Sequence, residues 1–223
     1  MPVYTTVIFD LDGTLLDTLE DLADGVNIAL DAFHMPSKTI EEVRLAVGNG
    51  VVRLMEQMVP CGKDNEQFEA CLDTFRTEYA KIARNKTKPY TGIKELLDTL
   101  AEKGYHMAVV SNKFHDAVVD LVKTYFPQIP HAAGERESCG IRKKPAPDTV
   151  FAMMEEIGVS AEECVYVGDS EVDVLTAKNA GIDCIAVTWG FREKKVLLDS
   201  GAVVLADTMS ELLDAIVHRK EQL

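Results

Sequence analysis

The stretch VIFDLDGTLLDT, from Val7 to Thr18, sets the expected fold, because it places Asp10 and Asp12 at the end of an apolar run of strand-forming residues. Asp-Gly between apolar runs is also a strong hairpin signal. A hairpin needs a second strand, however, and the residues after Asp17 have helical period. Residues i and i+2 of an extended segment project to the same side, so both carboxylates would face one pocket. Taken alone, the stretch leaves a turn and a reaction centre open.

The net charge of the chain limits the kinds of molecule that it can bind. The chain has 223 residues and a formal net charge of −14. This charge argues against binding to nucleic acid or to an anionic membrane surface, since both need clustered Lys and Arg. An anionic small molecule would need local cations or a metal at its site. No apolar run approaches the roughly 18 residues of a membrane-spanning helix, and the segment MPVYTTVIFD lacks the basic leader of a signal peptide.

The cysteines indicate the compartment. There are five of them, and none has C-x-x-C spacing, which argues against a disulfide framework and a zinc site. They are Cys61, Cys71, Cys139, Cys164 and Cys184. Reduced thiols fit a reducing cytosol, so we expect a cytoplasmic protein. No coiled-coil seam is visible, and we expect a monomer or a weak dimer.

Hydrophobic periodicity divides the chain. Residues 17–88 have helical period, and strands alternate with helices from residue 89 onward. Such alternation predicts a parallel sheet with helices on both faces. We therefore expect an α/β fold with a Rossmann-like core of residues 1–16 and 89–223, and a helical domain of residues 17–88 inserted after the first strand. The expected core strands are 7–9, 106–112, 163–170, 183–190 and 201–206, and the expected core helices are 93–103, 116–125, 172–180, 208–219 and one within 143–158.

Two further motifs follow strands of this expected sheet. Ser111 and Asn112 end the strand HMAVVSN. They would either cap the next helix or bind phosphoryl oxygens through hydroxyl, amide and backbone donors. Lys144 directly precedes Pro145, Pro147 follows two residues after Pro145, and both prolines stiffen the loop. A lone lysine is usually solvated, whereas a fixed ammonium group suits an anionic substrate.

A last pair of acids, Asp169 and Asp173, follows the strand VYVG at the start of a helix. They stand one helical turn apart, so both can face one point, and Mg²⁺ prefers carboxylate and water oxygens. A glycine and an acid after a strand also fit a simple turn. The order of all these motifs favours a reaction centre over separate turns and caps. An acid pair, a hydroxyl, a lysine and two more acids all fall at or shortly after strand ends of one sheet. Because parallel sheets bind ligands at that edge, the sequence predicts a reaction centre.

These motifs resemble, in the same order, the four motifs of the haloacid dehalogenase superfamily of phosphotransferases. The matching segments are Asp10-Leu11-Asp12-Gly13-Thr14, Ser111-Asn112, Lys144-Pro145, and Gly168-Asp169-Ser170 with Asp173. The resemblance spans nearly the whole chain, and the helical insertion looks like the small cap of that family. The segments SNK, KKPAPD, GDSEVDVLTAKNAG, VTWGFR and VGNGV resemble its phosphoglycolate phosphatase subfamily. One departure is Thr18 after Asp17, where serine is frequent.

The resemblance implies roles for these residues. Asp10 would attack phosphorus and form an aspartyl-phosphate, and Asp12 would protonate the leaving oxygen and then activate water. Mg²⁺ would be held by Asp10, Asp169 and the backbone carbonyl of Asp12, with Asp173 in support. Ser111 and Lys144 would hold the phosphoryl oxygens. The further substrate-binding candidates are Thr14, Asn112, Lys113 and Arg53.

Substrate choice would lie in the inserted helices. Arg53, near the segment VGNGV, and Lys113 are alternative partners for a substrate carboxylate, which an arginine can bind bidentately. Arg53 also fits a solvated helix residue. The expected reaction is Mg²⁺-dependent hydrolysis of a small phosphorylated metabolite, with 2-phosphoglycolate first and pyrophosphate, a sugar phosphate or a nucleoside monophosphate as alternatives.

Three other classes of protein share part of this pattern. A phosphotransferase like β-phosphoglucomutase keeps the aspartyl-phosphate but returns the phosphoryl group to sugar. A receiver-like signalling domain also combines acids, a hydroxyl, a lysine and Mg²⁺, but its phosphorylated aspartate ends the third strand and it has no helical insertion. A dinucleotide-binding domain is set aside, because Gly48-Asn49-Gly50 is a lone fragment in a helical region.

Overall fold

The centre of the molecule is a sheet of parallel strands. The computed structural model describes residues 4–136 and 140–218, so Cys139 and Arg219, which belong to the expectations above, lie outside the described residues. The six-stranded sheet has the order β5-β4-β1-β6-β7-β8, and every neighbouring pair is parallel. Its strands are β1 Thr6–Phe9, β4 His106–Phe114, β5 His131–Glu135, β6 Cys164–Gly168, β7 Asp183–Val187 and β8 Val204–Ala206. The predicted α/β fold with a Rossmann-like sheet is confirmed.

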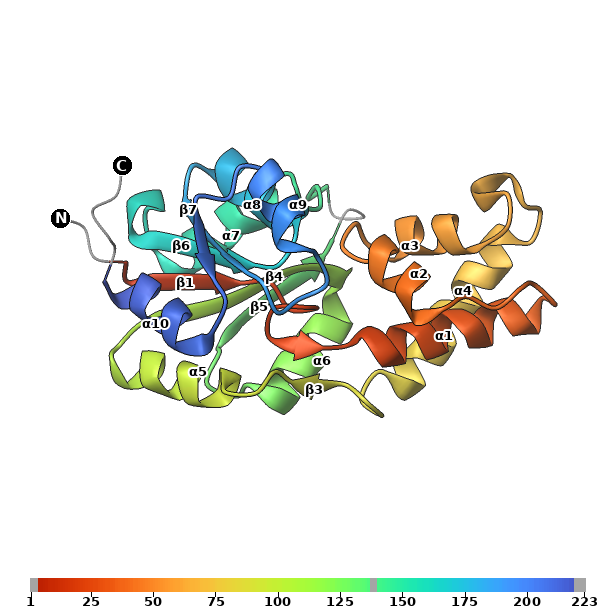
Figure 1. The fold of residues 1–223 in the computed structure, drawn as a ribbon, viewed down its shortest axis with the longest axis horizontal. Helices are drawn as coiled ribbons and strands as arrows, with labels where there is room; N and C mark the ends of the chain where they lie inside the picture. Colours follow the sequence, from red (N-terminus) through yellow and green to blue (C-terminus); the bar gives the residue numbers. More distant parts are fainter. Residues whose placement is uncertain (1–3, 137–139, 219–223) are drawn as a thin grey trace.

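Helices cover both faces of this sheet (Figure 1). Successive side chains of a strand point to opposite faces, so Val7 and Phe9 of β1 pack on one side and Ile8 on the other. The first face carries α5 Ile93–Glu102, α6 His115–Tyr125 and α10 Met209–Val217. The second carries α7 Asp148–Ile157 and α8 Glu171–Ala180, with α9 Lys194–Asp199 beside α8.

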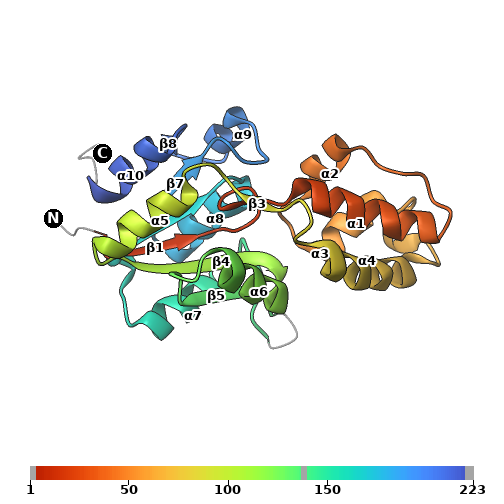
Figure 2. The same cartoon turned by 90° about the horizontal axis from the view of Figure 1, so that it is seen from below.

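Four helices between β2 and β3 lie to one side of the sheet and have their own hydrophobic cluster (Figure 2). We call them the inserted helices: α1 Leu19–Ala32, α2 Ile40–Ala46, α3 Val51–Met58 and α4 Phe68–Ile82, with the short 3₁₀ helix η1 Gly62–Asp64 before α4. The capping box predicted at Thr39 and Glu42 is formed, since each residue's side chain accepts a hydrogen bond from the other's backbone N–H.

The segment that leaves the sheet for the inserted helices and the segment that returns from them are hydrogen-bonded to each other. β2 Leu16–Asp17 pairs antiparallel with β3 Lys88–Pro89. The carboxylate of Asp21, which is buried, accepts hydrogen bonds from the backbone N–H groups of Lys86 at 3.0 Å and Thr87 at 2.8 Å. Because a buried carboxylate needs such partners, Asp21 ties the start of α1 to the returning chain.

Several details differ from the sequence-based expectation. β7 ends at Val187 instead of residue 190, because the backbone after it turns over the acids of the site. β5 was not expected, since His-Ala-Ala-Gly-Glu lacks β-branched residues; the two-residue strands β2 and β3 and helix α9 were not expected either. At Thr208 only half of the capping box forms, because the Glu211 carboxylate accepts from the N–H of Asp207. Within the described ranges, no helix has the length and apolar character needed to cross a membrane.

Candidate active site

The sheet order brings the predicted residues to one place. β1 lies between β4 and β6, and the chain runs outward on one side of β1 before it returns on the other. Ligands bind at the carboxyl ends of the strands at such a switch point. Asp10 follows β1, Ser111 lies near the end of β4 and Asp169 follows β6. A pocket opens there, and its charged lining residues are Asp10, Asp12, Lys113, Lys144, Asp169 and Arg192.

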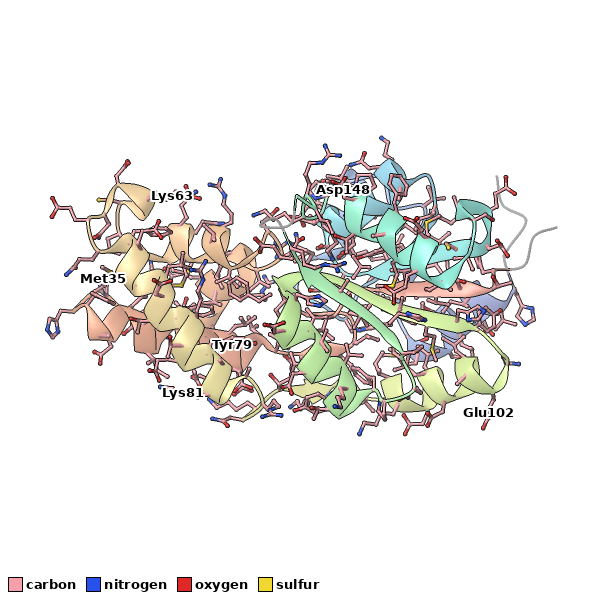
Figure 3. The ribbon with its side chains drawn as sticks, turned by 180° about the vertical axis from the view of Figure 1, so that it is seen from behind. Met35, Lys63, Tyr79, Lys81, Glu102 and Asp148 are labelled. Atoms are coloured by element: carbon pink, nitrogen blue, oxygen red, sulfur yellow. The ribbon has the colours of Figure 1, made fainter. Side chains whose placement is uncertain are left out.

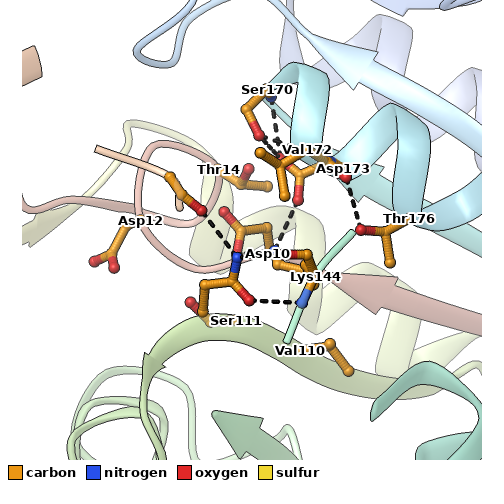
Figure 4. A network of polar contacts seen from close by, with 12 residues as sticks. Asp10, Asp12, Thr14, Val110, Ser111, Lys144, Ser170, Val172, Asp173 and Thr176 are labelled. Atoms are coloured by element: carbon orange, nitrogen blue, oxygen red, sulfur yellow. Dashed lines mark hydrogen bonds and ion pairs between the residues drawn. The ribbon is translucent and has the colours of Figure 1, made fainter. Parts of the chain in front are cut away.

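The ammonium group of Lys144 lies at the centre of this site (Figure 4). Its Nζ donates to Asp10 Oδ1 at 2.7 Å, to Asp173 Oδ1 at 2.8 Å and to the hydroxyl of Tyr166 at 3.0 Å. Only 3% of the lysine side chain is exposed. Burial alone would lower the pKa of Lys144, but the charges of Asp10 and Asp173 outweigh it and hold that pKa well above its ordinary value. The lysine therefore stays charged.

Two acids of the site, Asp10 and Asp169, hold their protons more tightly than free carboxyl groups do. Burial raises the pKa of Asp10 to about 7, opposed by the ammonium of Lys144 and assisted by the charge of Asp173. Burial and the charges of Asp173 and Asp10 also raise the pKa of Asp169 well above its ordinary value. One ammonium group is thus too little positive charge for the cluster, since buried like charges repel one another strongly.

Glycines allow the chain to pass close to Asp169. A Cβ at Gly13, where φ is +90°, would lie 2.4 Å from Asp169 Oδ2, and a Cβ at Gly190 would lie 2.3 Å from the same carboxylate. The carboxylate accepts a hydrogen bond from the Thr14 hydroxyl at 2.9 Å and one from the Phe191 backbone N–H at 2.7 Å. These contacts fix the orientation of Asp169 toward Asp10.

The acid cluster suits a hard divalent cation. Asp10, Asp169 and Asp173 each offer a carboxylate oxygen, and these oxygens lie within 4.8 Å of one another. All three residues are buried, and a cation would lower the raised pKa values of Asp10 and Asp169. Carboxylate oxygens are ligands that Mg²⁺ prefers, so the donor set fits that ion. The Asp12 carboxylate is not a member of this cluster.

The Asp12 side chain borders the pocket, as the sequence predicted, whereas the Thr14 side chain does not. The Asp12 carboxylate accepts hydrogen bonds from Lys113 Nζ at 3.0 and 3.1 Å, and it borders the pocket. Asp12 belongs to the metal candidates, therefore, only through its backbone carbonyl. The Thr14 hydroxyl is fully buried against Asp169, so its side chain supports that acid and does not face the pocket.

Ser111 and Asn112 both border the pocket, as the second motif predicts. The side chain of Asn112 brackets Lys144: its Oδ1 accepts from the lysine backbone N–H at 2.8 Å, and its Nδ2 donates to the lysine carbonyl at 3.0 Å. The same Nδ2 donates to the carbonyl of Gly48 at 3.0 Å. Asn112 thus positions the lysine loop and contacts the segment between α2 and α3.

The structure does not bring Arg53 to the pocket. Its side chain is 58% exposed and binds Glu56 at 2.6 Å, whereas Val51 and Leu54 of the same helix border the pocket. The arginine that does border the pocket is Arg192, which the sequence interpretation missed. Its only sequence signal was its place in VTWGFR, just after an expected strand.

Tyr166 was also missed. Its hydroxyl accepts from Lys144 and donates to the carbonyl of Val110 at 2.9 Å. The available signal was a polar group in an otherwise apolar, fully buried strand, because a buried hydroxyl needs a partner. Tyr166 supplies the third hydrogen-bond partner of Lys144 Nζ, beside Asp10 and Asp173.

Comparisons with known proteins agree with this geometry. Residues 7–187 match the family model described as haloacid dehalogenase-like hydrolase. The phosphoglycolate phosphatase of Vibrio parahaemolyticus is 34% identical over 94% of this chain and 95% of its own length, and that of Pseudomonas savastanoi is 33% identical over 93% and 78%. A crystal structure from Lactobacillus delbrueckii, described as a candidate phosphoglycolate phosphatase, is 37% identical, with a TM-score of 0.89 over 97% of this chain and 99% of that one. The chain belongs to the haloacid dehalogenase-like hydrolase family.

Proposed function

We propose that this chain is a Mg²⁺-dependent phosphatase that hydrolyses a small phosphorylated metabolite through an aspartyl-phosphate, with 2-phosphoglycolate as the first candidate. The observation that carries the proposal is the contact of Asp10 with Lys144 inside a cluster of buried acids that borders the pocket. Phosphoryl transfer depends on positioning and charge neutralisation, and this cluster provides both. The names of the relatives support the choice of substrate.

In the first step, an Asp10 oxygen forms a bond to phosphorus as the bond from phosphorus to the leaving oxygen breaks. The leaving oxygen takes a proton from Asp12. Water then attacks phosphorus, Asp12 takes its proton and the bond to Asp10 breaks. Such acid–base catalysis contributes about 10²–10⁴-fold. Lys144 and Ser111 hold phosphoryl oxygens, and Mg²⁺ held by Asp10, Asp169 and Asp173 would offset the repulsion between nucleophile and substrate.

We further propose that residues 17–88 form a cap domain over a core of residues 1–16 and 89–223, and that the cap selects the substrate. Its contribution to the pocket lining is apolar or glycine: Leu22, Val47, Gly48, Gly50, Val51 and Leu54. The two glycines there leave room for a small leaving group. The N-terminus of α3 begins at this lining, and its partial positive charge favours an anionic group.

Arg192 replaces Arg53 in this proposal as the arginine of the substrate site, because it borders the pocket. A cytoplasmic location is supported by the free cysteines of the described residues, Cys61, Cys71, Cys164 and Cys184. A monomer or a weak dimer remains our proposal for the assembly.

The test is phosphate release from a panel that includes 2-phosphoglycolate, pyrophosphate, glucose 1-phosphate and a nucleoside monophosphate, with Mg²⁺ and with chelator. We expect Mg²⁺-dependent release with 2-phosphoglycolate preferred, and loss of turnover in Asp10→Asn. Preference for another member of the panel would change the proposed substrate but would leave the proposed phosphatase activity in place. Unchanged kcat in Asp10→Asn would remove Asp10 as the nucleophile and overturn the proposal.

A further inference from the structure

The ammonium group of Lys113 is bound to the carboxylate of Asp12. Its Nζ donates to both oxygens of Asp12, at 3.0 and 3.1 Å, although the two residues lie 101 positions apart. Only 3% of the Lys113 side chain is exposed, against 13% for Asp12. Burial alone would lower the pKa of Lys113, but the Asp12 charge outweighs it and raises that pKa. A charged lysine is thus fixed to the acid that faces the pocket.

The same ammonium group also lies close to an aromatic ring of an inserted helix. Lys113 Nζ lies 4.8 Å from the centre of the Tyr79 ring, a distance at which a cation is attracted to the ring face. Tyr79 belongs to α4 and is buried. In Figure 3 it lies nearer the core than Met35 and Lys63 do. Its ring stacks on Phe75 of the same helix, with centroids 5.3 Å apart and planes 6° from parallel, and both residues belong to the hydrophobic cluster of the inserted helices.

We propose that Lys113 and Tyr79 are positioning residues for Asp12: Lys113 orients the Asp12 carboxylate, and the Tyr79 ring holds Lys113 in place only while the inserted helices are seated on the core. Two bonds to one ammonium group fix both the place and the plane of the carboxylate. A general acid must lie within hydrogen-bond reach of the leaving oxygen, so the orientation of Asp12 controls its two proton transfers. The inference rests on the acid–base role proposed for Asp12 above.

The alternative is that Lys113 binds the substrate carboxylate directly. In that role Lys113 would have to leave Asp12, to both of whose oxygens its Nζ donates, and the Tyr79 ring, whose centre lies 4.8 Å from that atom. The two roles predict different kinetics. A substrate-binding lysine contributes to KM and acts independently of Asp12, whereas a positioning lysine contributes to kcat and acts only through Asp12.

The decisive experiment is a double-mutant cycle with Lys113→Met and Asp12→Asn on 2-phosphoglycolate, or on the best substrate of the panel. We expect Lys113→Met to lower kcat by about 10²-fold, the lower end of what acid–base catalysis contributes, with little change in KM. In the Asp12→Asn background, we expect Lys113→Met to cost no more than about twofold further. Additive losses, or a loss that falls mainly on KM, would overturn the proposal in favour of substrate binding.

A second readout uses p-nitrophenyl phosphate, whose leaving group departs without protonation. With Lys113→Met, the first step on this substrate no longer needs Asp12, but water activation still does. We therefore expect a burst of p-nitrophenolate close to one equivalent of enzyme, followed by slow turnover. Slow release without a burst, at a KM like that of wild type, would show general damage to the site and overturn the positioning role.

The contribution of the inserted helix is tested by Tyr79→Leu, which removes the ring face, and by Tyr79→Phe, which keeps it. We expect Tyr79→Leu to lower kcat at least several-fold more than Tyr79→Phe, and to have no further effect in the Asp12→Asn background. The matched control is Phe68→Leu, which trims a buried ring of the same helix about 16 Å along its axis. Equal losses in Tyr79→Leu and Phe68→Leu would reject the link to Tyr79.

Failure of this inference is distinguishable from failure of the proposed function. If the wild-type protein releases phosphate and Asp10→Asn does not, the proposed phosphatase activity holds, whatever the double-mutant cycle shows. If neither releases phosphate from any substrate, the proposed function fails before the cycle is measured. Thermal melting of each variant, compared with wild type, separates lost positioning from lost folding.

Discussion

Arg192 donates a hydrogen bond from Nη2 to the backbone carbonyl of Val47 at 2.5 Å, and this bond joins the core to the C-terminal end of α2. The same guanidinium donates from Nε to Glu171 at 2.8 Å and from Nη1 to the carbonyl of Arg44 at 3.0 Å. The Arg44 guanidinium returns a bond to the carbonyl of Phe191. Because the carbonyls at a helix C-terminus carry partial negative charge, these arginines hold the inserted helices against the pocket.

Loss of Arg192 is expected to weaken this contact. We predict that Arg192→Leu lowers kcat/KM by about 10–100-fold, since hydrogen bonds of a charged group contribute about 1.5–3 kcal/mol. Glu171→Gln keeps the guanidinium and its carbonyl bonds, so we expect a smaller fall. The matched control is Arg53→Leu, which removes an exposed arginine paired with Glu56. Steady-state kinetics on 2-phosphoglycolate measures all three, and a larger effect in Arg53→Leu would return Arg53 to the substrate site.

Magnesium is expected to stabilise the folded protein through the acid cluster. At a concentration 100 times its Kd, a ligand that binds only the folded state adds about 2.7 kcal/mol, or roughly 5–10 °C in melting temperature for a chain of this size. Calorimetry with Mg²⁺ and with chelator measures the shift. We expect no shift in Asp169→Asn and the full shift in Asp31→Asn, an exposed acid of α1. A full shift in Asp169→Asn would place the ion elsewhere.

The ionisation of Asp10 gives the metal-free protein a predictable pH dependence. Burial raises the pKa of Asp10 from its ordinary 3.8 to about 7, so the folded state binds the proton more tightly than the unfolded state does. The stabilisation from this proton is complete below about pH 4 and is lost as the pH rises through about 7. In chelator, the free energy of unfolding of wild type minus that of Asp10→Asn should therefore fall between pH 4 and 8. Urea denaturation across this range checks the sign, and a difference that rises with pH would contradict it.

Removal of the Lys144 ammonium group is expected to lower the stability of the folded protein. Lys144→Met leaves Asp10 and Asp173 buried without their ammonium partner, and breaking a buried ion pair costs about 3–5 kcal/mol. We expect a loss of this size in the free energy of unfolding in chelator, partly recovered in Mg²⁺. Lys123→Met, at an exposed position of α6, is the control. Equal stability of the two variants would show that Lys144 does not balance the acid cluster.

The sequence was sufficient to predict the positions of site residues where a geometric rule applies to the whole sheet. Asp10, Ser111 and Asp169 could be placed together because the carboxyl ends of parallel strands share one edge. The rule for alternate residues correctly put Asp10 and Asp12 at one pocket, since both border it. It could not show which partner each carboxylate has, because the chain turns at Gly13, just after Asp12. Its carboxylate accordingly meets Lys113 and not the cluster of Asp10.

Residues of the inserted helices were harder to predict. Val51 and Leu54 occupy the pocket side of α3, and an eight-residue helix has too few turns to show from sequence which side that is. Arg53 lies between them in sequence and therefore points outward. Arg192 escaped notice because its carbonyl partners, Arg44 and Val47, lie 148 and 145 positions away. Such contacts depend on how the inserted helices dock, which no local pattern encodes.

The pairing of β2 with β3 has a consequence for how such enzymes diversify. Asp17 lies opposite Lys88, so the chain leaves the sheet and returns to it at neighbouring points. Everything between these points could be lengthened, shortened or exchanged for another protein's segment at small entropic cost, since loop closure depends only weakly on length. Recombination at this hairpin-like junction would supply a new specificity to an old reaction centre in a single genetic event.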